Sequence, residues 1–422
     1  MPKFRALTLA AAALLIAGCG GGGGGGGADG GAGDGPALSA ALAVLPPSAN
    51  AIAAPAQNVL PISVESGPAG GVNLAYATIT ICAPGSSANC QTIDHVLVDT
   101  ASTGLRIMSS ALSPALGLPQ QVDANGNPVA ECTQFASGYS WGPIKLADVN
   151  MAGKQASSLA IQVIADSAFA PVPLKCAGTG ASMGSLHDHG VNAILGLSVF
   201  RHDCGSACAL SAGLGVYHAC PASGCQEIAM PLADQLQNPA AALGADNNGI
   251  IVQLPSIAEA GAAGVRGALV FGIGTQANNG LGSASVLAVD AATGRITTIY
   301  KNRNFPEGVI DSASNALFFF DPDIPVCTGT AAAGFYCPAS TQSLTATLQA
   351  ANGNSVRVDF SVANAEALRT NNPSFSALSG LASPSFFALG FDWGLPFFFG
   401  RNVFVAFEGA NTPGGFGPYF AF

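Results

Sequence analysis

Two short segments of the chain repeat each other, and this repetition restricts the possible folds more than any other feature of the sequence. The first is HVLVDTASTGLRI at residues 95–107, and the second is EGVIDSASNALFF at residues 307–319. Each contains an aliphatic run, an aspartate, a hydroxyl residue, an alanine and a serine, in that order. The aspartates, Asp99 and Asp311, stand 212 positions apart (311 minus 99). A single such turn is common, but two matched segments predict that a whole domain is duplicated.

The residues around each aspartate are suited to fixing the orientation of its carboxylate. An aliphatic run before each acid is typical of a buried strand, so we expect both carboxyl groups at strand ends. Hydroxyl residues follow each acid by one and by three positions: Thr100, Ser102, Ser312 and Ser314. Hydroxyls at this spacing donate locally to a carboxylate and fix its orientation. Asp99 and Asp311 are therefore candidate catalytic residues, and the alternative is that both are turns ending unrelated strands.

The rest of the chain predicts an all-β fold. Its 422 residues are enough for two domains, and 49% hydrophobic residues can build a sizeable core. With 54 glycines and 27 prolines, many tight turns are expected. Predicted strands lie in residues 74–81, 95–100, 144–151, 159–165, 267–274, 355–362 and 402–409. Short helices are expected only at 227–237 and 363–370, with a turn or two at 108–116.

The charge of the chain excludes one class of partner. Only 9% of residues are charged, and the formal net charge is −10. No basic surface is available on which a phosphate backbone could lie. We therefore expect no nucleic-acid partner.

The N-terminus has the features of an export signal. Lys3 and Arg5 precede a short apolar run, and IAGC places small residues before Cys19, as in bacterial lipoprotein signals. Residues 1–18 are the predicted signal peptide, and residues 19–60 a lipidated cysteine and a tether rich in Gly, Ala and Pro. We expect the acylated Cys19 to bind the lipid bilayer of the bacterial envelope, at the outer membrane if the cell has two. The alternative is an ordinary signal peptide with an incidental cysteine.

Cysteine usage also favours export. Of 11 cysteines, ten remain when Cys19 is assigned to lipid, an even number suited to disulfides in an oxidising compartment. Close pairs predict local bridges, and two further cysteines are then left for each other: Cys82 with Cys90, Cys204 with Cys208, Cys220 with Cys225, Cys327 with Cys337, and Cys132 with Cys176. Residues 204–225 allow several pairings, and a zinc site formed by their four cysteines is the rival explanation.

Most of the mature chain resembles the pepsin-like aspartic peptidases. NLAYATITI and VLVDTASTGLRI are similar to the opening hairpin and first D-T-G-S loop of that family, and VIDSASNALFF is similar to its second loop. FASGYSWGPIKLADVNM resembles the flap, AILGLSVF the segment crossing beneath the first loop, GALVFGIG the strand that begins the second lobe, and PFFFGRNVFVAFEG the closing hydrophobic-glycine strand. The VDT…S..GLR and CGSAC patterns also resemble an uncharacterised bacterial lipoprotein family of unknown function.

The resemblance implies a two-lobed all-β fold, with an N-terminal lobe at 61–247 and a C-terminal lobe at 248–422. Asp99 and Asp311 would meet across the cleft and share a proton while they activate a water. Thr100 and Ser312 would lock the loops together, and Ser102 and Ser314 would bond the acids. Flap candidates are Phe135 and Tyr139. No cofactor or metal is implied, and we expect a monomer that takes a polypeptide substrate or ligand into the cleft between the lobes.

Both loops depart from the family in the same way. Ala101 and Ala313 stand where the family has glycine. Alanine keeps the N–H but adds a Cβ and disfavours a φ that only glycine takes freely. Because both loops changed in the same way and both kept the acid, we expect a membrane-tethered aspartic endopeptidase. The alternatives are a protein of the same fold that binds a peptide, glycan or envelope partner without cleaving it, and a structural or adhesive surface protein.

Overall fold

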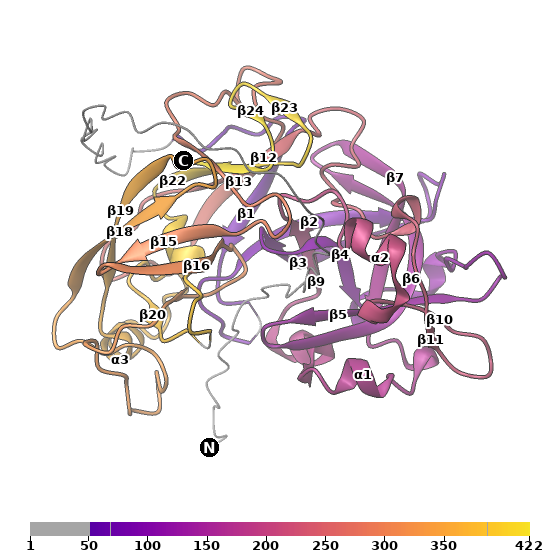
Figure 1. Ribbon diagram of the computed structural model, residues 1–422, viewed down its shortest axis with the longest axis horizontal. Helices are drawn as coiled ribbons and strands as arrows, with labels where there is room; N and C mark the ends of the chain where they lie inside the picture. Colours follow the sequence, from indigo (N-terminus) through magenta and orange to yellow (C-terminus); the bar gives the residue numbers. More distant parts are fainter. Residues whose placement is uncertain (1–50, 68, 386) are drawn as a thin grey trace, which may run out of the picture.

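The computed structural model describes residues 51–422 except 68 and 386. The predicted signal peptide, Cys19 and most of the predicted tether lie outside the described residues. The described chain consists mainly of β-strands with few helices (Figure 1), which confirms the prediction of an all-β protein. Each of the seven predicted strands overlaps a strand of the structure.

Within the described residues, sixteen strands form one sheet that uses both ends of the chain. Its order is β11-β10-β5-β6-β7-β4-β9-β3-β2-β1-β13-β12-β22-β25-β14, with β8 paired to β6 outside this path. The bounds are β1 (Val59–Val64), β2 (Ala75–Cys82), β3 (Cys90–Asp99), β4 (Thr103–Met108), β5 (Val129–Phe135), β6 (Gly138–Met151), β7 (Lys154–Ile164), β8 (Ala181–Ser182), β9 (Ala193–Leu197), β10 (Tyr217–Ala219), β11 (Gln226–Glu227), β12 (Gly249–Leu254), β13 (Val265–Phe271), β14 (Val286–Ala288), β22 (Arg401–Ala406) and β25 (Tyr419–Ala421).

A second sheet is built from the C-terminal part of the described chain. Its order is β19-β18-β15-β16-β21-β17-β20, and a separate hairpin pairs β23 with β24. The bounds are β15 (Ile296–Tyr300), β16 (Arg303–Ile310), β17 (Leu317–Phe318), β18 (Gln342–Gln349), β19 (Ser355–Val362), β20 (Ala382–Ser383), β21 (Asp392–Trp393), β23 (Asn411–Thr412) and β24 (Gly415–Phe416).

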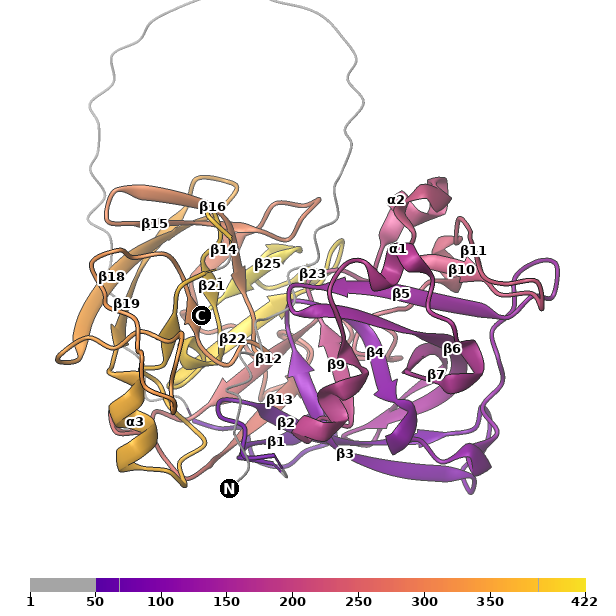
Figure 2. The same cartoon turned by 90° about the horizontal axis from the view of Figure 1, so that it is seen from below.

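The strands gather into two groups that share a middle. In Figures 1 and 2 the N-terminal group, β2 to β11, lies on the right and the C-terminal group, β14 to β21, on the left, with β1, β12, β13 and β22 between them. β1 pairs with β13 along its whole length, from Val59 opposite Val270 to Val64 opposite Val265. One buried apolar cluster contains residues of both groups, so they pack on a common core. β1 begins inside the predicted tether, and the predicted boundary at 247/248 lies just before β12.

The described helices are short: α1 (Leu174–Ala177), α2 (Gly205–Leu210) and α3 (Ala365–Asn371). α3 confirms the helix predicted at 363–370, and the Asn364 side chain caps it by accepting from the N–H of Ala367 at 2.9 Å. The helix predicted at 227–237 is wrong. Only a 3₁₀ turn at Leu232–Asp234 forms there, because Pro231 lacks an N–H and disfavours a helical residue before it. None of the helices in the described chain is long and apolar enough to cross a membrane.

Five disulfides join the ten cysteines of the described chain. They are Cys82–Cys90, Cys132–Cys176, Cys204–Cys208, Cys220–Cys225 and Cys327–Cys337. The four cysteines of residues 204–225 thus pair within their own close spacings, and their sulfurs are not free for zinc. Only the bridge between Cys132 and Cys176 closes a long loop, with a separation of 44 residues.

Candidate functional site

Asp99 and Asp311 occupy matching places at the ends of two strands. Asp99 is the last residue of β3, whose parallel neighbour β9 places Gly196 opposite it. Asp311 directly follows β16, and its N–H donates to the carbonyl oxygen of Trp393 in the parallel neighbour β21 at 3.1 Å. Asp99 is 1% exposed and Asp311 is 0% exposed. The aliphatic residues that precede each acid bury the strand, and with it the carboxyl group at its end.

Four reciprocal hydrogen bonds tie the two acid-bearing loops together. The hydroxyl of Thr100 donates to the carbonyl oxygen of Ile310 at 2.9 Å and accepts from the N–H of Ser312 at 3.0 Å. The hydroxyl of Ser312 donates to the carbonyl oxygen of Val98 at 2.7 Å and accepts from the N–H of Thr100 at 3.2 Å. Exchanging the two loops leaves this pattern unchanged, so they are related by a local two-fold. The structure therefore brings the two repeated segments together.

The loop of Asp99 supplies three hydrogen bonds to its carboxylate. The hydroxyl of Ser102 donates to Oδ2 at 2.5 Å, and the N–H groups of Ala101 and Ser102 donate to Oδ1 at 2.8 and 3.1 Å. Burial raises the pKa of Asp99, because the charged form loses its hydration. The three hydrogen bonds and the charge of Arg106 oppose that rise.

Asp311 lies in a more negative environment. Its Oδ1 accepts from the N–H of Ala313 at 2.8 Å, and the hydroxyl of Ser314 lies 3.1 Å from Oδ2. Burial raises the pKa of Asp311 well above its ordinary value, and the charges of Asp392 and Asp99 raise it further. Asp99 has more donors and a nearby guanidinium. It is therefore the carboxyl group that ionises more readily, and Asp311 is the one that keeps a proton.

Asp392 is a third carboxyl group at the site, which the sequence analysis missed. Its Oδ2 lies 2.5 Å from the hydroxyl of Ser314, which also reaches Asp311. Burial raises the pKa of Asp392 to about 8; the Ser314 hydrogen bond lowers it and the charge of Asp99 raises it. The available signal was an aspartate isolated in the apolar run FFALGFDWGLPFFFG at 386–400.

The segment that crosses beside the second loop is β21, and Gly394 directly follows it. The segment PFFFGRNVFVAFEG, compared above with the closing strand of the family, forms a 3₁₀ turn and β22. Gly400 instead has a φ of +76° and lies between a 3₁₀ turn and β22. A Cβ at Gly394 would meet the carbonyl oxygen of Ser314 at 2.7 Å, and one at Gly196 would meet that of Gly104 at 2.7 Å. Each crossing strand therefore passes directly against an acid-bearing loop.

The alanines that replace the family glycine are accommodated without strain. Neither Ala101 nor Ala313 has a positive φ, so neither loop needs the backbone freedom of glycine. Both keep the N–H that donates to their acid. The Cβ of Ala313 has a place as well, because this residue packs in a buried apolar cluster with Leu97 and Phe135.

Residues 54–422 match a family described as "Protein of unknown function (DUF3443)". The chain belongs to this family. No curated protein matches it. Membership agrees with the resemblance to a family of unknown function, and it assigns no activity to the site.

The hairpin of β5 and β6 carries the two flap candidates of this family member, and they pack in different clusters. Phe135 pairs with Gly138 across the hairpin turn and packs in the same buried cluster as Ala313. Tyr139 packs in a different cluster with Trp141, beside the disulfide that joins β5 to α1. Phe135 is therefore the flap candidate that shares a buried cluster with a residue of the second acid-bearing loop. It has no hydroxyl, so its packing there is apolar.

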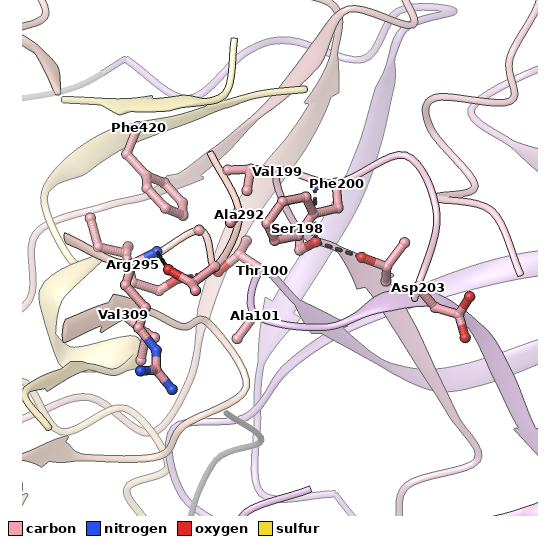
Figure 3. Close-up of a pocket in the computed structure, with 14 residues that line it drawn as sticks. Thr100, Ala101, Ser198, Val199, Phe200, Asp203, Ala292, Arg295, Val309 and Phe420 are labelled. Carbon is pink, nitrogen blue, oxygen red and sulfur yellow. Dashed lines mark hydrogen bonds between the residues drawn. The ribbon is translucent and has the colours of Figure 1, made fainter. Parts of the chain in front are cut away.

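A small cavity lies between the two groups of strands, next to the first acid-bearing loop. Figure 3 shows Thr100 and Ala101 with Val309 and Arg295 on one side and Phe200 on the other. Its volume is about 60 Å³, which holds a few water molecules but no segment of polypeptide.

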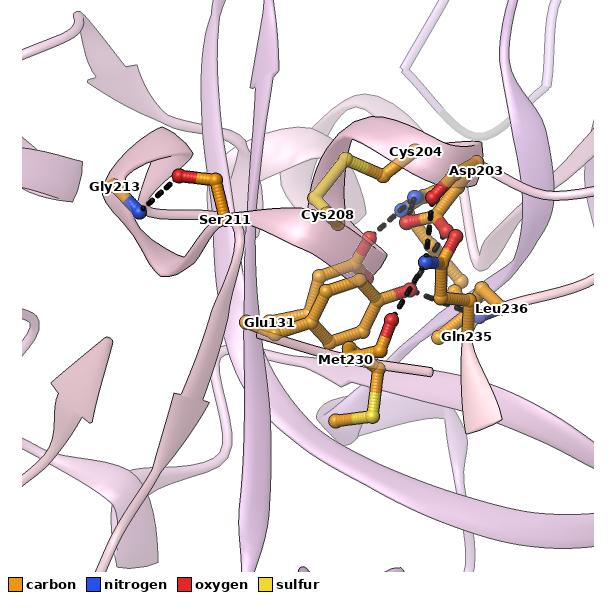
Figure 4. Close-up of a disulfide and its surroundings, with 12 residues drawn as sticks. Glu131, Asp203, Cys204, Cys208, Ser211, Gly213, Met230, Gln235 and Leu236 are labelled. Atoms are coloured by element: carbon orange, nitrogen blue, oxygen red, sulfur yellow. Dashed lines mark hydrogen bonds and ion pairs between the residues drawn. A yellow bond between two sulfur atoms is a disulfide. The ribbon is translucent and has the colours of Figure 1, made fainter. Parts of the chain in front are cut away.

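A buried charge cluster under the hairpin connects it to the strand after Asp99. Arg106 in β4 lies 2.7 Å from Glu131 in β5 and 3.8 Å from Asp203, which also accepts from the Tyr217 hydroxyl at 2.6 Å. Burial alone lowers the pKa of Arg106, but the charges of Glu131 and Asp203 raise it above its ordinary value. Figure 4 shows Asp203 and Glu131 beside the Cys204–Cys208 disulfide. The sequence analysis missed this cluster, although an arginine inside the apolar strand GLRIM was its signal.

Proposed function

We propose that this protein is an aspartic endopeptidase of the pepsin-like type, in which Asp99 and Asp311 together activate one water. The observation that carries the proposal is the set of reciprocal hydrogen bonds between Thr100 and Ser312. These bonds hold two buried carboxyl groups, 212 residues apart in sequence, at one local two-fold. A pair of adjacent carboxyl groups that cannot both ionise is suited to general acid–base chemistry.

In the proposed reaction the ionised Asp99 accepts a proton from the water, whose oxygen attacks the carbonyl carbon of the peptide bond. Protonated Asp311 gives its proton to the carbonyl oxygen, forming a neutral tetrahedral diol. The proton held by Asp99 then moves to the leaving nitrogen, and one diol hydroxyl returns its proton to Asp311 as the carbon–nitrogen bond breaks. Both carboxyl groups end in their starting states, so no covalent intermediate, metal or cofactor takes part.

The proposal includes a two-lobed pepsin-like fold, with lobes at 61–247 and 248–422. Its support is the repeated arrangement of strand, acid, loop and crossing strand, present once with β3 and β9 and once with β16 and β21. It also includes an exported protein tethered through acylated Cys19, with a polypeptide as substrate and no nucleic-acid partner. The signal-like N-terminus supports the tether, and five disulfides support an oxidising compartment.

The test is digestion of an unbiased peptide mixture between about pH 3 and 7, where carboxyl pairs titrate. We expect the unaltered protein to cleave with a bell-shaped pH dependence, and we expect Asp99→Asn and Asp311→Asn each to abolish cleavage, because the acids act as a unit. Asp94→Asn, an exposed aspartate on the same strand as Asp99, is the matched control and should keep activity. Cleavage that survives in the double Asn variant would show that the pair has no catalytic role.

The second candidate function is binding without cleavage. It is favoured by the burial of both acids beneath the Phe135 cluster and by the small size of the adjacent cavity. A statine-containing peptide, which mimics the tetrahedral intermediate, distinguishes the two functions. Binding that needs both acids, without cleavage at any pH, would favour the binder.

A further inference from the structure

We infer that Asp392 is a positioning residue of the carboxyl pair, which acts with the Ser314 hydroxyl to keep the working proton on Asp311 to higher pH. This inference rests on the proposed function, because it concerns the proton that the reaction uses. Asp392 reaches Asp311 in two ways: through the Ser314 hydroxyl, which lies within hydrogen-bond distance of both carboxyl groups, and through its own charge.

The geometry of Ser314 makes the three groups interdependent. Its hydroxyl oxygen lies 2.5 Å from Oδ2 of Asp392 and 3.1 Å from Oδ2 of Asp311, but a serine has one hydroxyl proton to donate. When Asp392 is ionised, it takes that proton and Asp311 loses a donor. When Asp392 is protonated, its own O–H donates to Ser314, which then donates to Asp311. If both carboxyl groups were ionised, this single hydroxyl could donate to only one of the two Oδ2 atoms.

The other half of the site lacks this third acid. In the sheet register, Val309 pairs with Asp392 just as Leu97 pairs with Ile194, so Ile194 stands where Asp392 would be expected by the local two-fold. Ser102 consequently donates to Asp99 without a competing carboxylate at this position. The substitution Asp392→Ile would therefore make the second half of the site match the first half at this position.

The surroundings of Asp392 favour a protonated group. Its Oδ1 is buried and has no hydrogen-bond partner among the described residues. The titratable groups that face it are the carboxyls of Asp311 and Asp99, from the loops after β16 and β3. Neighbouring β17 carries no titratable residue, and Glu307 in β16 is paired with Arg295 at 3.4 Å.

Three carboxyl groups in one buried cluster release their protons at higher pH than two, because each ionised group disfavours ionisation of the next. The alkaline limb of the activity profile reports loss of the proton on Asp311, whereas the acid limb reports ionisation of Asp99. Once Asp392 has ionised, it carries a like charge and takes the Ser314 proton; a variant without Asp392 lacks that charge and leaves the Ser314 hydroxyl to donate to Asp311. Both changes favour ionised Asp311 and move the alkaline limb downward.

The first experiment compares the pH profiles of peptide cleavage by the unaltered protein, Asp392→Asn and Asp392→Ile. We expect the alkaline midpoint to fall by about one pH unit, the low end of the shift that a neighbouring charge produces. The acid midpoint should stay within experimental error. Ile194→Leu, at the equivalent position without a charge change, should leave both midpoints unchanged. An alkaline midpoint that is the same with and without Asp392 overturns the inference.

The second experiment needs no catalysis, and so it separates this inference from the proposed function. The pKa of Asp392 is about 8 in the folded protein against an ordinary 3.8. The folded protein therefore holds a proton that the unfolded chain has released, and this stabilisation is full below pH 3.8 and is lost as the pH rises toward 8. Urea unfolding of the unaltered protein should lose stability across this range.

In Asp392→Asn and Asp392→Ile the slope of stability against pH should shrink by about one bound proton. Asp392→Asn keeps a polar group beside Ser314, so the slope can still be measured with this variant if Asp392→Ile does not fold. Equal slopes in all three proteins overturn the inference. If the slope is reduced in the Asp392 variants but no protein cleaves peptides at any pH, the proposed function is wrong, whereas the assignment of a proton to Asp392 is confirmed.

Discussion

At the scale of single residues, the site depends on buried hydroxyl groups whose hydrogen bonds are all made. Thr100 and Ser312 are 2% and 0% exposed, and each both donates and accepts across the local two-fold. A buried polar group without a partner costs more than its hydrogen bond contributes when made. The two hydroxyls therefore have a structural role that can be measured apart from any chemistry.

Thr100→Val keeps the shape of the side chain but leaves the carbonyl oxygen of Ile310 and the N–H of Ser312 without that partner. We expect the free energy of unfolding to fall by about 1–3 kcal/mol, and Ser312→Ala should have a similar effect. The double variant should lose less than the sum, because both changes break the same network. Thr78→Val, an exposed threonine of β2, is the control and should change stability by less than about 0.5 kcal/mol. Additive losses in urea unfolding would show that the two loops do not support each other.

At the scale of elements, each acid-bearing loop is backed by a crossing strand that needs a glycine. β9 and β21 approach their loops so closely that a Cβ at Gly196 or Gly394 would lie 2.7 Å from a backbone carbonyl oxygen. Backbone cannot move aside as cheaply as the end of a flexible side chain. The glycines thus matter for the space they leave, since neither has a positive φ.

Gly196→Ala and Gly394→Ala should each lower the free energy of unfolding by about 1–3 kcal/mol, as overpacking in a closed core does. Gly394→Ala should in addition shift the alkaline limb of any peptidase activity, because it displaces Ser314 and hence both Asp311 and Asp392. Gly244→Ala is the matched control, since nothing lies within 4 Å of a Cβ there and its φ is not positive. Equal thermal unfolding of all three variants would contradict the close packing described for these crossings.

At the scale of the whole molecule, the N-terminal and C-terminal groups of strands are joined by long-range pairing. β1 runs along β13 for six residue pairs. Buried Asn73 donates to the carbonyl oxygens of Asn315 and Leu378 at 2.8 and 2.9 Å, and accepts from the Leu378 N–H at 2.7 Å. The site between the groups is therefore held by contacts on several sides.

The proposed lipid anchor also belongs to the scale of the whole molecule. Cys19→Ser should release the protein from membranes and abolish fatty-acid labelling, because a serine hydroxyl does not replace the acylated thiol. The measurements are membrane fractionation and labelling of the intact chain. Ser39→Ala, within the same predicted tether, is the control and should leave the protein bound. Unaltered protein that carries no lipid would show that Cys19 is incidental.

Local patterns in the sequence were enough to predict seven strands, the helix at 363–370 and the hydroxyl groups beside each acid. These features depend on neighbours within a few residues, and the same is true of the close cysteine pairs. Only the tertiary structure decided which distant groups meet. Ser314 and Asp392 are 78 residues apart, and the pairing of β21 with β16 and β17 brings them together. Arg106 in β4 and Asp203, which lies in no strand, likewise meet only in the folded chain, because the fold and not local spacing sets which buried charges become neighbours.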